Sequence, residues 1–241
     1  MWWHNDDAML NAHIVKKRRD MIVDVSLELE SGDALGLFGA SGAGKSTVLA
    51  CIAGIDEPDD GFVKLNNLQL FPPSLPLHRR PLGYLTQEPG LFPHLTVGEN
   101  VRFGIPKVVG AEQNHWIETL RDHLHLGPLW SAPASLISGG QARRVSLARM
   151  LARNPPLVLL DEPFAGLDRG LVRELIDDLV FWSKTMCFSI IAVDHRADVL
   201  SRLCPRQAIV LERGRIVQKG TWNELCSAPA TPLLRSLLAP I

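Results

Sequence analysis

The segment GLFGASGAGKST, residues 36–47, has the composition of a loop that binds phosphate groups. It contains the pattern G-x-x-x-x-G-K-[ST], between an apolar run and an apolar helical pattern. Glycines let backbone N–H groups curl around phosphate oxygens, the lysine reaches the β- and γ-phosphates, and the serine hydroxyl is a ligand for Mg²⁺. The residues expected to contact a nucleotide are Gly39, Ala40, Ser41, Gly42, Ala43, Gly44, Lys45, Ser46 and Thr47.

Two adjacent carboxylates follow the apolar run LVLL at 157–160. Ligands of open parallel sheets bind beyond the carboxyl ends of the strands, so Asp161 is placed to hold Mg²⁺ through water. Glu162 is placed to orient and polarise an attacking water. One carboxylate suffices for magnesium, so the second favours hydrolysis over simple binding. The alternative is a pair of solvated acids at a strand end.

The segment ISGGQ, residues 137–141, predicts a helix start with exposed N–H groups. Ser138 and Gln141 match a capping box. Two glycines are costly inside a helix, about 1 kcal/mol each relative to alanine, but inexpensive in its first turn. A bare helix start suits an approaching phosphate, whereas a helix cap alone leaves the two glycines unexplained. Since the phosphate loop already holds a nucleotide, a second such site requires a second nucleotide or a second subunit.

The elements that must position these residues alternate between strands and helices. Continuous apolar runs indicate strands buried on both faces of a parallel sheet, and they lie at 34–38, 157–160, 188–193 and 208–211. Residues 171–182 have apolar positions at helical spacing. This order predicts an α/β fold with a mostly parallel sheet. Residues 88–150 have few strand patterns and predict a helical insertion.

Composition excludes several classes. The 241 residues carry a net charge of −1, so no overall basic field attracts nucleic acid or anionic lipid. No apolar run is long enough to span a membrane, and the N-terminus has no apolar segment of a signal peptide. The four cysteines, Cys51, Cys187, Cys204 and Cys226, have no C-x-x-C spacing and are expected to be reduced, buried thiols.

The motifs together resemble the ATP-binding subunits of ABC transporters, over essentially the whole chain. GASGAGKST resembles their Walker A motif, LVLLDEP their Walker B motif with the catalytic glutamate, and ISGGQ their signature motif. Gln87 in YLTQEP matches the Q-loop, Asp168 in AGLD the D-loop, and His195 in AVDHR the switch histidine. Order and spacing match as well, whereas Walker A alone is shared with kinases and GTPases.

The resemblance implies a P-loop NTPase, one ABC ATPase domain over 1–241, with an α/β core at 1–87 and 151–241 and a helical signature subdomain at 88–150. It implies ATP and Mg²⁺, with two subunits packed head to tail around two ATP molecules. The signature residues expected at the partner's γ-phosphate are Ser138, Gly139, Gly140 and Gln141, with Asp168 nearby. The implied catalytic residues are Glu162, His195 and Gln87, and the implied magnesium ligands are Ser46, Gln87 and Asp161.

Three positions depart from the family pattern. Ile137 replaces the usual leucine of the signature, and Asp194 replaces a serine or threonine before the histidine, which adds a carboxylate near the phosphates. The family stacks adenine on an aromatic residue upstream of Walker A, but HIVKKRRDMIV at 13–23 contains none. The adenine contact is therefore left unassigned.

Residues 88–105 resemble the region after the Q-loop in importer ATPases, which lies against the membrane subunit. Leu91, Phe92, Pro93 and Leu95 are expected to form an apolar docking surface, or alternatively the core of the helical subdomain. The implied partners are a second such subunit (a homodimer or a similar ATPase), permease subunits and, indirectly, an extracytoplasmic substrate-binding protein. The implied location is the cytoplasmic face of the membrane. The chain ends soon after GTWNEL, which predicts no C-terminal regulatory domain.

Among importers the pattern is most similar to molybdate and related oxyanion systems. Three alternatives remain. An exporter subunit shares the motifs. A non-transport ABC ATPase acting on nucleic acid or ribosomes usually has a long coiled coil or a second ATPase domain. A small-molecule kinase needs an acceptor site and a lid, and leaves ISGGQ unexplained. No nucleic-acid partner is expected.

Overall fold

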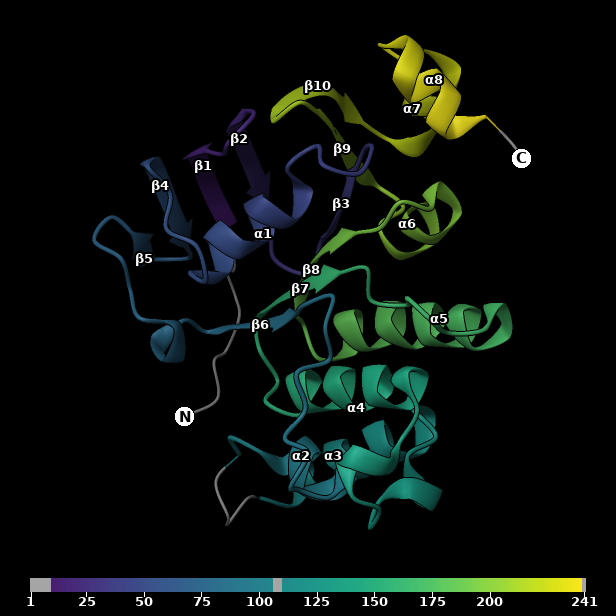
Figure 1. Cartoon of the computed structure of the whole chain (residues 1–241). Coiled ribbons are helices and arrows are strands. Elements are labelled where there is room, and N and C mark those ends of the chain that lie inside the picture. The colour runs from purple at the N-terminus through teal and green to yellow at the C-terminus, as the bar shows by residue number, and fades with distance from the viewer. Residues whose placement is uncertain (1–9, 106–109, 240–241) are drawn as a thin grey trace.

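The computed structural model describes residues 10–105 and 110–239, which form one sheet with helices on its faces (Figure 1). The strands are β1 (Leu10–Lys17), β2 (Ile22–Leu29), β3 (Ala34–Phe38), β4 (Asp60–Leu65), β5 (Leu68–Phe71), β6 (Leu82–Leu85), β7 (Leu157–Asp161), β8 (Ser189–Val193), β9 (Gln207–Glu212) and β10 (Arg215–Gly220). The α-helices are α1 (Lys45–Ala53), α2 (Val97–Arg102), α3 (Ala111–His123), α4 (Gly139–Leu151), α5 (Arg169–Thr185), α6 (Ala197–Leu203), α7 (Trp222–Ser227) and α8 (Pro232–Leu238). Short 3₁₀ turns lie at η1 (Leu77–Arg79), η2 (Gly127–Leu129) and η3 (Ala134–Leu136).

The parallel half of the sheet consists of the four strands that the apolar runs predicted, β3, β7, β8 and β9, and of β6, which they did not predict. The strand order is β5-β4-β1-β2-β10-β9-β3-β8-β7-β6, and every pairing from β9 to β6 is parallel. All five residues of β7 and all five of β8 are buried, as expected for strands covered on both faces. The predicted α/β fold is therefore confirmed, and the carboxyl ends of β3, β6, β7 and β8 lie at one edge.

The other half of the sheet is antiparallel, apart from one parallel bridge between β2 and β10, and was not predicted. Strands β1 and β2 pair over their full lengths, and β4 and β5 extend the sheet beyond β1. In β2, buried and exposed residues alternate strictly, as in a strand with one solvated face. Helix α1 packs on the buried face of both halves, where Val48, Leu49 and Ile52 share one core with residues of β1, β2 and β7.

A helical layer lies between β6 and β7 in the chain and occupies the lower part of Figure 1. Helices α2, α3 and α4 contribute buried residues such as Val101, Trp116 and Leu147 to a second core. This core continues without a break to Leu160 of β7 and Ile190 of β8. The helices thus belong to the same folded unit as the sheet, and the subdomain limits at 88 and 150 stay a prediction.

Two expectations from composition can be compared with the structure. No disulfide bond joins the four cysteines, and Cys51 and Cys204 are buried as predicted, whereas the prediction of burial is wrong for Cys187 and Cys226, which are exposed. Within residues 10–105 and 110–239, none of the helices combines the length and the apolar character needed to cross a bilayer.

Candidate functional site

The loop between β3 and α1 is shaped by glycines at positions where a side chain does not fit. Gly39 has φ +142°, and a Cβ there would lie 2.3 Å from the carbonyl oxygen of Leu211. Gly44 has φ +103°, and its Cβ would lie 2.9 Å from the Val23 side chain. Gly44 also starts α1 without a side-chain cap, so no side chain occupies the N–H groups of the first turn. The loop therefore suits the binding of an anion at the N-terminus of α1.

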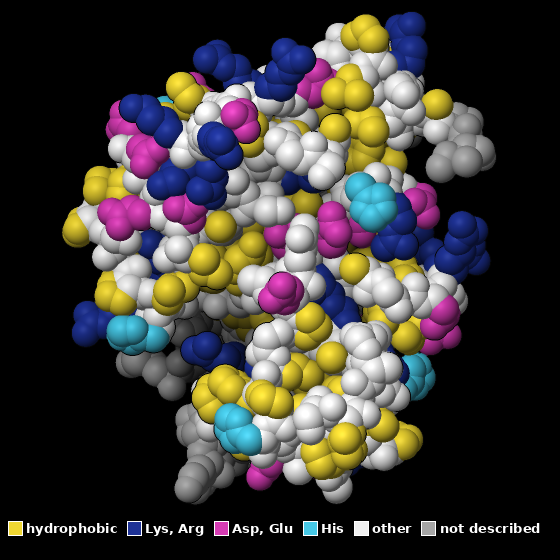
Figure 2. Space-filling view, in the orientation of Figure 1, with side chains coloured by type: hydrophobic (Ala, Val, Ile, Leu, Met, Phe, Trp, Pro, Cys, Tyr) yellow, Lys and Arg dark blue, Asp and Glu magenta, His cyan; other side chains and the backbone are white. Residues whose placement is uncertain are grey.

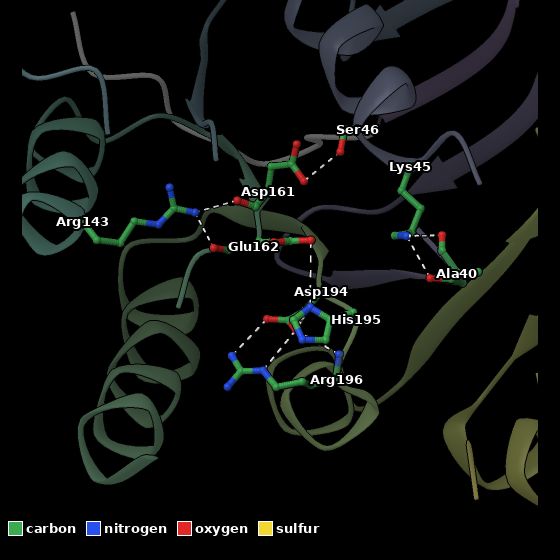
Figure 3. A network of polar contacts seen from close by, with 10 residues as sticks. Ala40, Lys45, Ser46, Arg143, Asp161, Glu162, Asp194, His195 and Arg196 are labelled. Atoms are coloured by element: carbon green, nitrogen blue, oxygen red, sulfur yellow. Dashed lines mark hydrogen bonds and ion pairs between the residues drawn. The ribbon is translucent and has the colours of Figure 1, made fainter. Parts of the chain in front are cut away.

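Lys45 places a buried cation inside this loop. Its Nζ donates to the carbonyl oxygens of Gly39 and Ala40, both at 2.8 Å, and the residue is only 7% exposed (Figure 3). Burial lowers the pKa of the ammonium, and the charges of Glu162, Asp161 and Asp194 oppose that shift. The ammonium is thus held by the loop itself, facing carboxylates from β7 and β8.

Ser46 and Asp161 bring the loop and the end of β7 into contact. The Ser46 hydroxyl donates to Oδ1 of Asp161 at 3.0 Å, and the Tyr84 hydroxyl donates to Oδ2 at 3.3 Å. Burial raises the pKa of the Asp161 carboxyl, and the Ser46 hydrogen bond opposes the shift. A hydroxyl and a carboxylate within hydrogen-bond distance form an oxygen donor set that suits Mg²⁺. Tyr84, which reaches this carboxylate from β6, was not among the predicted site residues.

Glu162 and His195 lie beside each other at the ends of β7 and β8. Nδ1 of His195 is 3.9 Å from Oε1 of Glu162, and the histidine side chain is 70% exposed. The backbone of Glu162 is left-handed, with φ +48°, and its N–H donates to the carbonyl of Val193 at 2.9 Å. A non-glycine residue in this region is strained and must be held by its surroundings. Two of the three residues that the family resemblance implies as catalytic, Glu162 and His195, are therefore neighbours in this chain.

Asp194 is not a free carboxylate, although the sequence placed it near the phosphates. It is 1% exposed, and Arg196 holds both its oxygens through Nε and Nη2 at 3.2 Å each. The backbone N–H of Arg196 donates to the same carboxylate at 2.9 Å. The negative charge added at this position is therefore paired with a cation two residues away.

The segment Ser138–Gln141 forms the capping box that the sequence predicted. The Ser138 hydroxyl accepts from the Gln141 N–H at 3.3 Å, and Oε1 of Gln141 accepts from the Ser138 N–H at 2.8 Å. A Cβ on Gly140 would lie 3.3 Å from the Gly166 carbonyl, so close packing accounts for that glycine. A Cβ on Gly139 would meet no atom of the described residues within 4 Å. The fold of this chain therefore does not require glycine at 139.

Three other predicted residues lie at loop ends or helix starts. The Gln87 carbonyl accepts from Arg143 at 2.9 Å, and the residue is exposed. Asp168 caps α5, because its Oδ1 accepts from the Leu171 N–H at 2.9 Å. Thr47 accepts a hydrogen bond from Nε of Arg18 at 3.3 Å. A contact of Gln87, Asp168 or Thr47 with a nucleotide or metal stays a prediction.

A groove lined by aromatic and basic side chains lies where the helical layer meets β6. Phe92 stacks on Phe103 with ring centroids 4.2 Å apart, and the guanidinium of Arg149 lies 5.3 Å from the Phe92 ring. Both rings and Arg149 line a groove of about 370 Å³. Leu91, predicted with Phe92 as a docking residue, is partly buried and packs against the core, and its role in docking stays a prediction. Figure 2 shows apolar side chains gathered over the helical layer in the lower part of the view.

Comparisons with known proteins agree on one family. A protein-family model described as ABC transporter matches residues 22–165. The molybdate/tungstate import ATP-binding protein WtpC of Thermococcus kodakarensis is 38% identical over 210 residues, which cover 86% of this chain and 63% of the relative. The Fe(3+) ions import ATP-binding protein FbpC 1 of Rhodococcus jostii is 40% identical over 210 residues, 85% of this chain and 59% of the relative. The chain thus spans about three fifths of the length of each.

A solved structure confirms the fold independently. The chain superimposes on a structure titled "Structure of ATP binding subunit of ABC transporter" with a TM-score of 0.80 and 26% sequence identity. The superposition covers 95% of this chain and 97% of that one.

Proposed function

Because this chain belongs to the ABC transporter family, we propose that it is a subunit that hydrolyses ATP to power transport through separate permease subunits. One observation carries the proposal. The hydrogen bond from Ser46 to Asp161 joins the phosphate loop to the end of β7, where Glu162 follows directly. A loop that only bound nucleotide would not need Glu162 beside that pair. The arrangement is that of a site that binds a phosphate chain and activates water.

Each residue has a role that follows from its position. Lys45 neutralises the β- and γ-phosphates, while the loop N–H groups bind their oxygens. Ser46 and Asp161 would hold Mg²⁺, with Gln87 as a further ligand, and the metal would neutralise charge on the phosphate oxygens. Glu162 accepts a proton from the attacking water. His195, whose Nδ1 is 3.9 Å from Oε1 of Glu162, would contact the edge of the γ-phosphate.

We further propose that two such subunits close head to tail around two ATP molecules. Gly139 supports this arrangement, because it lies at an exposed helix start and its own chain places nothing against it. Ser138, Gly139, Gly140 and Gln141 would bind the γ-phosphate of the partner subunit's ATP. Hydrolysis would remove the group that holds the two halves together, so the dimer would act as a switch. Homodimers and pairs with a similar ATPase both fit.

The groove that contains Phe92 and Phe103 is the proposed contact with a permease. Exposed aromatic rings beside an arginine are common in protein interfaces. This contact would hold the subunit at the cytoplasmic face of the membrane, with a substrate-binding protein acting on the far side. The relatives are named as importers of molybdate or tungstate and of Fe(3+). We therefore propose import of an inorganic ion, with an oxyanion as the first substrate class to test.

Two measurements test this function. The purified chain with ATP and Mg²⁺ should release inorganic phosphate without any phosphoryl acceptor, and it should co-purify with a permease subunit when the two are expressed together. A requirement for an acceptor molecule would identify a kinase instead. ATP hydrolysis by a chain that co-purifies with no permease subunit would favour a non-transport ABC ATPase.

Replacing Lys45 with alanine is expected to weaken ATP binding itself. The change removes the loop's side-chain cation, and a hydrogen bond to a charged group contributes about 1.5–3 kcal/mol, or roughly ten- to a hundredfold in Kd. Binding of a fluorescent ATP analogue measures the loss. Lys184→Ala, at an exposed lysine of α5, is the matched control and should bind like the wild type. Equal affinity in all three proteins would remove Lys45 from the site.

A further inference from the structure

Arg143 is a buried cation that contacts two of the segments forming the site. It lies in α4, five residues after Ser138, and is 2% exposed. Its guanidinium donates to five backbone carbonyl oxygens, those of Thr86, Gln87 (2.9 Å), Asp161 (2.6 Å), Glu162 and Pro163 (3.0 Å). Two of these carbonyls follow β6, and three lie at the end of β7 or directly after it. Figure 3 shows the side chain directed at Asp161 and Glu162.

Only a guanidinium can make this set of contacts. It is planar and carries five N–H donors in a fixed fork, whereas a lysine ammonium has its three donors on one nitrogen. Burial lowers the pKa of Arg143, and the charges of Asp161 and Glu162 oppose that shift. The cation is thus stabilised by carbonyl dipoles and by the same carboxylates whose backbone it holds.

The contact at Glu162 coincides with strained backbone. Glu162 adopts φ +48°, which a residue with a side chain rarely does. Its N–H is fixed by the Val193 carbonyl, and its own carbonyl is fixed by Arg143. The left-handed turn is therefore held at both ends of the residue, and this turn decides where the Glu162 carboxylate is directed.

Helix α4 also holds the segment after β6. Besides the two carbonyls bound by Arg143, the Pro89 carbonyl accepts from the Ser146 hydroxyl at 2.8 Å and from Nη2 of Arg149 at 3.1 Å. The guanidinium of Arg149 in turn lies over the ring of Phe92, in the groove between the helical layer and β6. One face of α4 therefore connects the groove, the backbone of Gln87 and the backbone of Glu162.

We propose that Arg143 is a positioning residue for ATP hydrolysis, which holds Glu162 and Gln87 at fixed positions relative to the helix that begins after Ser138. This inference rests on the proposed function and adds a residue to it. Arg143 would not contact the phosphates or the attacking water itself. It would act through its hydrogen bonds to the backbone of Gln87 and Glu162.

The test is a comparison of Arg143→Lys with Arg144→Lys. Both arginines lie in α4 and donate to backbone carbonyls, but Arg144 reaches Leu124 (2.8 Å) and His125 (3.4 Å), away from the site. Arg143→Lys should lower kcat at least about tenfold while the Kd for a non-hydrolysable ATP analogue stays within twofold, because the phosphate loop is untouched. Arg144→Lys should keep kcat within about twofold of the wild type. Arg143→Gln serves as a second variant if the lysine protein does not fold.

A second measurement does not depend on hydrolysis. Amide hydrogen exchange of the free protein should become faster at 86–89 and 161–165 in the Arg143 variants, and stay unchanged there in Arg144→Lys. Unchanged exchange in these segments overturns the inference, and so does a wild-type kcat in an active Arg143→Lys protein. A wild-type protein that hydrolyses no ATP contradicts the proposed function, and the exchange data then still decide whether Arg143 holds the two segments.

Discussion

Glu162→Gln is expected to abolish ATP turnover while ATP binding remains. Glutamine has the size and shape of glutamate but no oxygen basic enough to accept a proton from water. General base catalysis contributes about 10²–10⁴-fold, so kcat should fall at least about a hundredfold. The backbone contacts of residue 162, to Val193 and from Arg143, involve no side-chain atom of that residue and are kept.

The same change should stabilise the dimer that precedes hydrolysis. Removing one negative charge beside the γ-phosphate lowers the repulsion that ATP meets at the site. With hydrolysis blocked, the two subunits have no step that releases them. Gel filtration with ATP and Mg²⁺ should therefore show a dimer for Glu162→Gln under conditions where the wild type elutes as a monomer.

The matched control is Glu174→Gln, which removes the same charge from a glutamate on α5 whose side chain is 66% exposed. It should hydrolyse ATP like the wild type and form no trapped dimer. Wild-type rates in Glu162→Gln would show that another group activates the water, and the pairing of Glu162 with His195 would then be structural.

Gly139→Asp is expected to block dimer closure and hydrolysis together, without weakening ATP binding to the single subunit. A carboxylate at this position would face the partner's γ-phosphate across a gap with little water, and like charges at that range cost roughly several kcal/mol. The phosphate loop, Gly39 to Thr47, is not changed. Light scattering with ATP should show monomers, while a fluorescent ATP analogue should bind normally.

The structure separates this effect from damage to the fold. A Cβ at 139 points into open space, and an acidic residue in the first turn of α4 is favoured by the helix dipole. The thermal unfolding temperature should therefore stay the same or rise slightly. Gly127→Asp is the control, since Gly127 is also exposed with open space at its Cβ. It should leave dimerisation and hydrolysis intact.

Mixing Gly139→Asp with Lys45→Ala provides the decisive measurement. In a head-to-tail mixed dimer, one composite site combines an intact phosphate loop with an intact Ser138–Gln141 segment, and the other site carries both lesions. Some ATPase activity should return on mixing if one sound site suffices. Normal ATP-dependent dimerisation of Gly139→Asp alone would mean that the two glycines serve only the helix start.

Most strands of the parallel half, and the site residues that follow them, were predictable because each is marked by the residue types within a short stretch of sequence. Continuous apolar runs mark β3, β7, β8 and β9, and helical spacing marks α4 and α5. The capping box of Ser138 and Gln141 is likewise a contact within four residues. The antiparallel half was missed although apolar and polar residues alternate in β2 from Val23 to Leu29. That pattern is the usual signal of a half-exposed strand.

Arg143 and Tyr84 could not be assigned from motifs, because their roles depend on partners far along the chain. Arg143 and Arg144 are adjacent and chemically equal, and only the phase of α4 distinguishes them. Arg143 shares its face with Ser146, Leu147 and Met150, all buried, and this helical spacing was the available signal. Nothing local indicates that the Tyr84 hydroxyl reaches Asp161, 77 residues later.

The order of strands in the sheet has a consequence for the synthesis of the chain on the ribosome. Strand β3, which precedes the phosphate loop, pairs with β8 and β9, whereas β7, which carries Asp161, pairs with β6 and β8. Within the sheet, the strands that carry the two parts of the nucleotide site are therefore connected through β8, which lies between them. Until Ser189–Val193 has been translated, a nascent chain contains every residue of the phosphate loop and both carboxylates but has no strand to align them. Since a chain is made from its N-terminus, the ability to hold ATP with magnesium should arise late in translation and in a single step.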